Sequence, residues 1–407
     1  MKLTSFPPVR SAAVIAALTL SLTSLSALAQ AKYGPGASAT EIKLGQTMPY
    51  SGPASAYGTI GKVELAYFKM INDQGGINGR KIDLISLDDG YSPPKTVEQV
   101  RKLVEEDNVL ALFDTLGTPT NSAIQKYVNA KKVPHLFLAT GATKWGDPKH
   151  FPWTMGFNLT YQTEGEIYAK YLLKHKPNAK IAILYQNDDY GKDLLKGVKD
   201  GLGAANAKMI VAEQTYETTD PTIDSQILSL QASGADTFID ITTPKFGAQA
   251  VRKAFDSGWK PLHFLNNVAA SVGTVLTPAG LEKSNGLITV EYYKDPTDPA
   301  WKDDPAMKEW FAFMAKYYPD GNVRDASNVF GVLAAQTMVQ VLKQCGNDLT
   351  RENVMKQAAN LKDLKLPLLL PGITINTSPT DFFPVKQAQL ARFDGKAWVL
   401  FGDVIGD

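Results

Sequence analysis

The chain has 407 residues, of which 44% are hydrophobic, and 42 Lys and Arg residues balance 41 Asp and Glu residues. This length predicts about two or three domains, and this composition excludes disordered and collagen-like chains. The formal net charge of +1 argues against a general nucleic-acid-binding protein, which would carry a strong basic excess. The single Cys345 excludes an intrachain disulfide, and the scattered histidines disfavour a histidine-built metal centre. We therefore expect neither a metal nor a cofactor.

The N-terminal stretch is typical of a secretory signal peptide. Two basic residues precede the apolar run 12–22, and a small-residue pattern, Ala-Leu-Ala, ends at Ala29. A membrane anchor is disfavoured because the run is shorter than the about 20 residues that span a bilayer. We expect residues 1–29 to be removed, by cleavage after Ala29 or Ala31. With no cysteine near that point, the mature protein is expected to be periplasmic and not lipid-anchored.

Strand-like apolar runs then alternate with amphipathic segments of helix length. The predicted strands are 41–48, 81–87, 109–113, 135–139, 180–185, 208–213, 237–241, 263–266 and 287–290. The predicted helices include 62–74, 94–106, 162–175, 191–203 and 329–344. This alternation indicates βαβ units around a mainly parallel sheet, so the predicted fold class is α/β. Cys345, at the end of the last helix, is expected to be a free, partly buried thiol.

An internal repeat in the order of the predicted elements favours two similar α/β lobes. Residues 81–114 are predicted to form a strand, a loop with a proline, a helix and a strand that ends in Asp114. Residues 208–240 repeat this order and end in Asp240. Chance similarity between two generic βαβ units is the alternative explanation. Ligands bind at the carboxyl ends of such strands and at domain interfaces, so a binding site is expected in the loops that follow the strands.

Four stretches carry a recognisable pattern. They are Ile42–Gly58 with SGPASAYG, Ile71–Val104 with GGI-x-G, Lys132–Thr143 with ATGAT, and Ile181–Leu202 with QNDDYG. On these stretches the chain resembles the type I periplasmic solute-binding proteins of ABC importers, in the leucine/isoleucine/valine-binding protein family. Residues 139–157 look like a subgroup of that family that takes up aromatic acids.

The resemblance implies an architecture and a partner. Two Rossmann-like lobes, joined by three crossover hinge strands, are expected to close on a ligand as a Venus flytrap does. Lobe one is expected to comprise 40–156 and 287–382, and lobe two 157–286 and 383–407. The protein is expected to act as a monomer that presents its ligand to an inner-membrane ABC permease, and not as an enzyme.

The resemblance also carries over ligand-binding positions. They are Tyr57, Leu116, Gly117, Thr118, Gly141, Thr143, Tyr190, Thr242, Thr243 and Asn267. Tyr57 matches an aromatic residue that packs on the ligand. Gly117 stands where the family has a serine that holds the ligand carboxylate. The hydroxyl is therefore expected from Thr118 or Thr115, unless backbone amides alone serve.

The other carried-over positions extend this site. Gly141 matches a backbone contact, which turn geometry alone would also explain, and Thr143 matches a hydroxyl contact. Tyr190 matches a tyrosine of lobe two, and either Thr242 or Thr243 falls near another. Three further tyrosines have two interpretations: they form aromatic walls of the site, or they serve structural packing alone. These are Tyr161, Tyr292 and Tyr293.

Asn267 departs from the family in a way that bears on the ligand. The family has an acidic residue there, which pairs with the α-ammonium of the ligand. A buried ammonium without a carboxylate partner is costly, so Asn267 argues against an α-amino acid. An amide suits a hydroxyl, carbonyl or carboxylate oxygen better. Candidate cations for a ligand carboxylate are Lys144, Lys245 and Arg324.

The leading hypothesis is therefore a binding protein for a small organic acid of the aromatic, benzoate-like kind. The alternatives on the same fold are a branched-chain amino acid or an aliphatic amide as the ligand, or a periplasmic ligand sensor. An exported hydrolase is disfavoured because the chain has no G-x-S-x-G motif, no metal motif and no credible triad.

Overall fold

The structure, a computed structural model, describes Met1 and residues 31–406. The expected signal peptide lies outside the described residues. Within them, no helix combines the length and the apolar character needed to cross a membrane.

Lobe one is built on a parallel five-stranded sheet of order β3-β2-β4-β5-β6. Its strands are β2 (Glu41–Met48), β3 (Lys81–Asp88), β4 (Ala111–Phe113), β5 (His135–Leu138) and β6 (Thr154–Gly156). Strands β4 and β5 are mainly apolar and fully buried because helices cover both faces of the sheet.

The helices of lobe one form two layers around this sheet. One layer holds α1 (Gly58–Asp73) packed against α10 (Ser327–Cys345), and the other holds α2 (Pro93–Arg101) and α3 (Thr118–Ala130). Right-handed crossovers explain this division, since α1 and α2 connect strands in opposite directions along the sheet. Apolar side chains of α2 and α3 form a separate core with those of β4.

Lobe two is built on a seven-stranded sheet of order β14-β13-β11-β10-β9-β7-β8. The parallel strands are β7 (Ile181–Gln186), β8 (Ile210–Tyr216), β9 (Thr237–Ile241), β10 (Leu262–Leu265) and β11 (Ile288–Glu291). The antiparallel edge consists of β13 (Gln387–Phe393) and β14 (Trp398–Gly406). Its helices are α4 (Tyr161–His175), α5 (Asp189–Leu202), α6 (Asp224–Ala232) and α7 (Pro244–Asp256).

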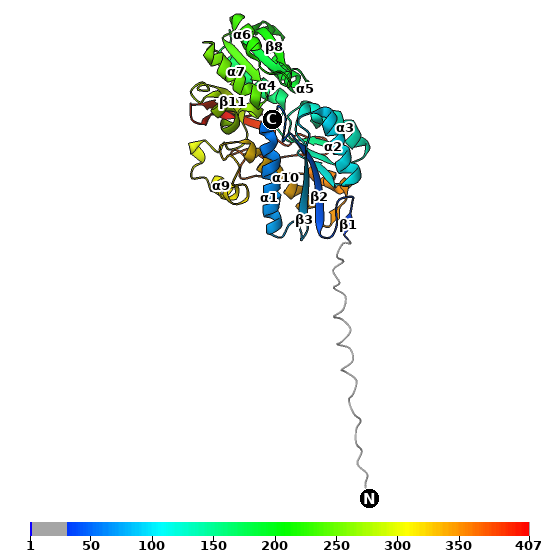
Figure 1. The fold of residues 1–407 in the computed structure, drawn as a ribbon. Coiled ribbons are helices and arrows are strands. Elements are labelled where there is room, and N and C mark those ends of the chain that lie inside the picture. The colour runs from blue at the N-terminus through cyan, green and yellow to red at the C-terminus, as the bar shows by residue number, and fades with distance from the viewer. Residues whose placement is uncertain (2–30, 407) are drawn as a thin grey trace.

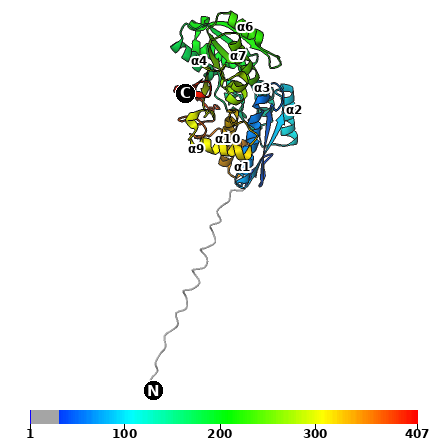
Figure 2. The same cartoon turned by 60° about the vertical axis from the view of Figure 1, so that its left-hand side comes forward.

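Both views of the molecule show the same division of helices. In Figures 1 and 2, α4, α6 and α7 lie in one lobe, and α1, α2, α3 and α10 lie in the other. The other labelled helix of lobe one is α9 (Pro305–Tyr317), close to α1. The remaining elements are β1 (Lys32–Tyr33), β12 (Asp348–Leu349), α8 (Thr277–Ala279) and α11 (Arg351–Ala358).

The two lobes repeat one topology. Strands β2 to β6 are ordered β3-β2-β4-β5-β6, and strands β7 to β11 are ordered β8-β7-β9-β10-β11. Successive strands therefore take equivalent places in the two sheets. The two segments of the internal repeat, 81–114 and 208–240, occupy equivalent places, as β3-α2-β4 in one lobe and β8-α6-β9 in the other. This equivalence favours a true structural repeat over chance similarity.

The predicted elements are found with small differences. The α/β class and the mainly parallel sheets are confirmed, and Cys345 is a free, buried cysteine. The helix expected at 94–106 changes at Lys102 into a π-helical turn that ends at Glu106. Strands β1, β6, β12, β13 and β14 were not predicted. The first three of them are only two or three residues long, and β13 and β14 lie in a C-terminal stretch for which no element was predicted.

The expected division of the chain between the lobes remains a prediction. One of its boundaries differs from the boundary that the strand pairing indicates. Lobe one was expected to resume at residue 287, but β11 pairs with β10 and with β13 in the sheet of lobe two. β11 is the last parallel strand of the second repeat. The chain therefore crosses back to lobe one only after β11.

Candidate ligand-binding cavity

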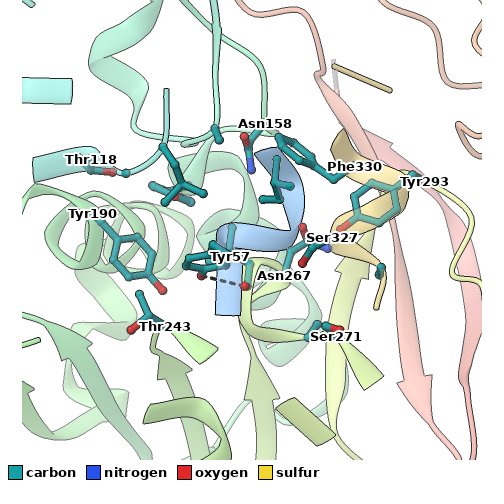
Figure 3. Close-up of a pocket in the computed structure, with 18 of the residues that line it drawn as sticks. Tyr57, Thr118, Asn158, Tyr190, Thr243, Asn267, Ser271, Tyr293, Ser327 and Phe330 are labelled. Atoms are coloured by element: carbon teal, nitrogen blue, oxygen red, sulfur yellow. Dashed lines mark hydrogen bonds between the residues drawn. The ribbon is translucent and has the colours of Figure 1, made fainter. Parts of the chain in front are cut away.

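The candidate site is a cavity between the lobes, lined by side chains from both of them. Its walls come from the segments that follow β2 to β6 in lobe one and β7, β9 and β10 in lobe two, together with the end of β11 and the start of α10. All these strands end at the cavity, which is where open α/β sheets bind ligands. Figure 3 shows the side chains converging on this space from both lobes.

Aromatic side chains dominate the walls. They are Tyr57, Tyr91, Tyr161, Tyr190, Tyr292, Tyr293 and Phe330. The rings of Tyr161 and Tyr190 lie 4.9 Å apart, and those of Tyr292 and Tyr293 meet edge to face at 4.7 Å. Burial raises the pKa of Tyr161 to about 12, so its hydroxyl stays neutral at any physiological pH. The cavity therefore offers ring faces and neutral hydroxyls to a ligand.

Tyr57 bridges the lobes. It ends a short 3₁₀ turn, Ser55–Tyr57, that precedes α1. Its hydroxyl donates a hydrogen bond of 2.9 Å to the carbonyl of Val268 in lobe two. This expected site residue thus lines the cavity and also holds the lobes together across it (Figure 3).

Tyr190 faces Tyr57 from lobe two. Asp188 caps α5 by accepting hydrogen bonds from the backbone N–H groups of Tyr190 and Gly191, which fixes the start of the helix. The Tyr190 hydroxyl donates to the carbonyl of Thr242 at 3.0 Å and accepts from the amide of Asn266 at 2.8 Å. Since its hydroxyl is held by protein, Tyr190 presents its ring to the cavity.

The two neighbouring threonines of lobe two separate in the structure. Thr243 lines the cavity, whereas Thr242 does not. The hydroxyl of Thr242 donates to Asp240 at 2.6 Å, and its carbonyl supports Tyr190. The sequence could not choose between them, and the structure brings Thr243 to the site.

Leu116, Gly117 and Thr118 form the end of the cavity at the N-terminus of α3. The hydroxyl of Thr118 is 2.6 Å from that of Thr140. The first turn of a helix has N–H groups without intrahelical partners and carries the positive end of the helix dipole. This end of the cavity therefore suits an anionic or carbonyl group. Thr115, the other candidate hydroxyl, instead donates to Asn121 at 2.6 Å, behind the cavity wall.

Gly141 and Thr143 do not line the cavity. The backbone N–H and the hydroxyl of Thr143 both donate to the carboxylate of Asp193, at 2.8 and 2.9 Å. The carbonyl of Gly141 accepts from the N–H of Tyr161 at 2.8 Å, and a Cβ at Gly141 would meet the Leu159 carbonyl at 2.3 Å. These residues position Tyr161 and connect their loop to α5.

Asn267 lines the cavity, but its amide nitrogen is occupied. Its side chain donates to the carbonyl of Val290 at 2.7 Å and to the carboxyl of Glu291 at 3.2 Å. Its backbone N–H donates to Glu164 at 2.7 Å. Glu164 also accepts from the hydroxyl of Tyr168, and burial raises the pKa of its carboxyl to about 7. Asn267 is thus part of a network that contains two buried carboxyl groups.

Sequence reasoning missed Glu291, which overturns one step of the ligand argument. The asparagine at 267 was interpreted as the loss of a carboxyl group from the site. The structure places the carboxyl of Glu291 in the wall of the same cavity. Its position at the carboxyl end of a predicted strand was the available signal. An amino group in the ligand is therefore not excluded by Asn267.

The candidate cations lie elsewhere. Lys144 pairs with Asp189 at 2.9 Å, and Lys245 donates to the carbonyl of Asp220. Arg324 does not line the cavity either. Across residues 31–406, the side chains lining this cavity include no Lys, Arg or His. A ligand carboxylate would be held there by hydrogen bonds and the end of α3, and not by an ion pair.

Comparisons with known proteins agree with this architecture. The chain matches the family described as periplasmic binding protein over residues 41–397. A Leu/Ile/Val-binding protein homolog 7 of Brucella suis is 24% identical over 344 residues, which cover 82% of this chain and 84% of that protein. A leucine-specific-binding protein of Salmonella typhimurium is 25% identical over 270 residues, 65% of this chain and 72% of that protein.

Solved structures show the same fold. A branched-chain amino acid ABC transporter protein of Thermus thermophilus with bound valine has a TM-score of 0.81 at 16% identity, over 90% of this chain and 97% of that one. A fatty acid ABC transporter substrate-binding protein of Thermomonospora curvata has a TM-score of 0.78 at 24% identity, over 93% and 95%. Because the family match spans most of the sequence, the chain belongs to the periplasmic binding protein family, whose members bind solutes and are not enzymes.

Proposed function

We propose that this chain is the extracytoplasmic solute-binding component of an ABC importer, and that it acts as a monomer. It takes a small carboxylic acid with an aromatic body between its lobes and delivers it to an inner-membrane permease. The observation that carries this proposal is the inter-lobe cavity, with tyrosine rings along its walls and the N-terminus of α3 at one end. The named ABC transporter proteins among the solved structures support the transport role.

The chemistry of the walls favours an amphipathic ligand. Ring faces such as those of Tyr161 and Tyr190 stabilise an aromatic body by about 0.5–1.5 kcal/mol per pair beyond the area that is buried. The end of α3 stabilises a negative group by about 0.3–1 kcal/mol, and by up to about 2 kcal/mol when partly buried. The hydroxyl of Thr118 lies at that end of the cavity.

A branched-chain amino acid is the second candidate ligand. Two observations favour it: the carboxyl of Glu291 in the cavity wall, and the Leu/Ile/Val-binding names of relatives such as that of Brucella suis. The tyrosine walls would contact an aliphatic side chain as well as an aromatic one.

Calorimetry on the full chain, unfolded and refolded to remove bound solute, tests the carboxylate. We expect benzoate or 3-phenylpropanoate to bind with a Kd in the micromolar range or tighter, and their primary amides to bind at least tenfold more weakly. The T118V variant should lose about tenfold in affinity for the acid. The T143V variant, altered outside the cavity, should not. Binding of leucine or valine without any aromatic acid would favour the second candidate, and amides that bind as tightly as the acids would contradict the proposal.

A further inference from the structure

A second hollow in lobe two is separate from the inter-lobe cavity. It is a groove of about 850 Å³ between α4 and the antiparallel strands β13 and β14. The groove and the inter-lobe cavity have no lining residue in common. Its volume lies within the range of about 300–1,000 Å³ that is usual for small-molecule sites.

The groove exists because only one face of the ribbon formed by β13 and β14 is covered. Alternate side chains of a strand point to opposite faces of the sheet. Ala391 and Trp398 are buried in a core with residues such as Val272. A face of an antiparallel sheet that meets water is usually polar, but this one is mainly apolar. The side chains that it turns to the groove include Leu390, Arg392, Val399, Phe401 and Ile405.

Helix α4 forms the other wall with side chains from one of its faces. Ile167, Tyr171 and Lys174 follow each other at the spacing of a helical face, and all three line the groove. The ring of Tyr171 lies 6.0 Å from that of Phe401, edge to face. Since Val399 is 43% exposed, the apolar floor between these rings is open to solvent. Apolar side chains gathered in an open groove indicate an interaction site.

The groove also holds a positioned guanidinium group. That of Arg392 lies over the ring of Phe401, at 5.4 Å from its centre, and donates a hydrogen bond of 3.2 Å to the hydroxyl of Tyr171. A guanidinium group has five N–H donors, so this bond leaves others available. In the part of the chain that the structure describes, neither Arg392 nor Lys174 forms an ion pair, whereas Lys170 pairs with Glu166 at 3.4 Å.

Two carboxylates line the groove as well, but they do not neutralise these cations. The carboxylate of Asp394 accepts from the backbone N–H groups of Lys396 and Ala397, at 2.8 and 2.9 Å. Asp403 lines the groove without an ion pair to Arg392 or Lys174 among residues 31–406. The two cations therefore remain available to an anion that enters the groove.

We propose that this groove is a second binding site, which takes a small amphipathic anion with a long apolar body, such as an alkyl carboxylate. Arginine binds a carboxylate through two parallel N–H bonds, and Arg392 is already held in place for this by Tyr171 and Phe401. The apolar body then lies along Leu390 and Val399. This site goes beyond the transport role, because it lies outside the inter-lobe cavity.

The test measures the binding of dodecanoate to the purified full chain by calorimetry, below the concentration at which micelles form. We expect a Kd in the micromolar range, with butanoate and dodecyltrimethylammonium each about tenfold weaker or more, because one lacks the apolar body and the other the negative charge. R392Q should lose about tenfold in affinity for dodecanoate. V399E, which puts a carboxylate directly opposite Arg392 on the paired strand, should lose at least as much.

The matched control is R101Q, since Arg101 is also an exposed guanidinium over an aromatic ring, that of Tyr127 in lobe one. It should bind dodecanoate as the wild type does. Loss of dodecanoate binding in T118V but not in R392Q would place the probe in the inter-lobe cavity and overturn the proposal. Equal binding of dodecyltrimethylammonium and dodecanoate would overturn it too. So would self-association or binding to phosphatidylglycerol vesicles that depends on Arg392, if dodecanoate itself does not bind.

Discussion

A single hydroxyl group, that of Tyr57, carries a hydrogen bond from one lobe to the other. Its acceptor, the carbonyl of Val268, lies 2.9 Å away in the cavity wall. The resemblance to the family implied an aromatic residue that packs on the ligand, and it did not indicate this second role. The bond exists only where the two lobes meet, so it depends on tertiary structure.

The Y57F variant is expected to bind ligand about threefold to tenfold more weakly. A buried hydrogen bond contributes about 0.5–1.5 kcal/mol, and its loss destabilises the closed form that holds the ligand. The measurement is the Kd by calorimetry. The matched control is Y50F, which removes a hydroxyl bonded at 2.6 Å to Ser86 within lobe one. Equal losses in both variants would contradict the bridging role.

Glu164 gives a pH-dependent prediction. Its pKa is about 7 in the folded protein because of burial, against about 4.5 when it is exposed. The folded form thus holds a proton that the unfolded form releases between these values, so stability is highest below pH 4.5 and is lost as the pH rises through 7. At about 1.4 kcal/mol per pKa unit, the loss approaches about 3 kcal/mol.

The E164Q variant removes this titration and retains an oxygen acceptor for Tyr168 and Asn267. We expect its free energy of unfolding, measured with urea, to increase relative to that of the wild type between pH 5 and pH 8. The control is E166Q, because Glu166 is exposed at the surface of the same helix. A difference between E164Q and wild type that does not change with pH would contradict the raised pKa.

At the scale of elements, the start of α3 depends on the backbone of Gly117. This residue has a φ of +100°, which favours glycine, and it precedes the first turn of the helix. A Cβ there would lie 2.5 Å from the ring of Tyr91 and 2.6 Å from the hydroxyl oxygen of Thr120. The residue therefore sets both the direction of α3 and the approach of Tyr91 to the cavity.

The G117A variant is expected to be less stable by about 1–3 kcal/mol and to bind ligand at least tenfold more weakly. Thermal unfolding and calorimetry measure the two effects. G203A is the matched control, since Gly203 also has a positive φ, +71°, but a Cβ there would meet nothing within 4 Å. It should lose stability without losing affinity. Unchanged affinity in G117A would contradict a ligand contact at this helix end.

The helices and strands show which parts of the fold the sequence patterns predict. The alternation of apolar runs and amphipathic segments predicted the parallel strands of both large sheets, apart from β6, within a few residues. It did not predict the pairing of β11 with lobe two, because pairing partners are decided by the register of whole sheets. The π-helical turn that begins at Lys102 has no clear signal in the sequence.

At the scale of the whole molecule, several contacts hold the lobes in a closed arrangement. The hydroxyl of Ser271 in lobe two donates to the carboxyl of Asp325, just before α10 of lobe one, at 2.8 Å. The backbone N–H of Gly273 donates to the carbonyl of Arg324 at 2.9 Å. Both bonds lie beside the cavity and must break if the lobes separate to admit a ligand.

We expect the S271A variant to open more readily than the wild type. Small-angle scattering should show a smaller radius of gyration for the wild-type protein with ligand than without it. Half-maximal compaction of S271A should need about threefold to tenfold more ligand, from the loss of about 1 kcal/mol. S284A is the control, because Ser284 bonds within lobe two to the carbonyl of Gly280. A radius of gyration that ligand does not change would contradict hinge closure.

The sequence by itself determined the α/β class, the repeated lobes and the loops in which a ligand site belongs. These features depend on local periodicity and on the rule that parallel strands end together, and both can be followed in one chain. The tertiary structure alone decided which side chains meet. It put Thr243 and Glu291 into the cavity wall, and it placed Gly141 and Thr143 behind that wall. Side-chain neighbours come from segments far apart in sequence, and the closing of one lobe on the other brings them together.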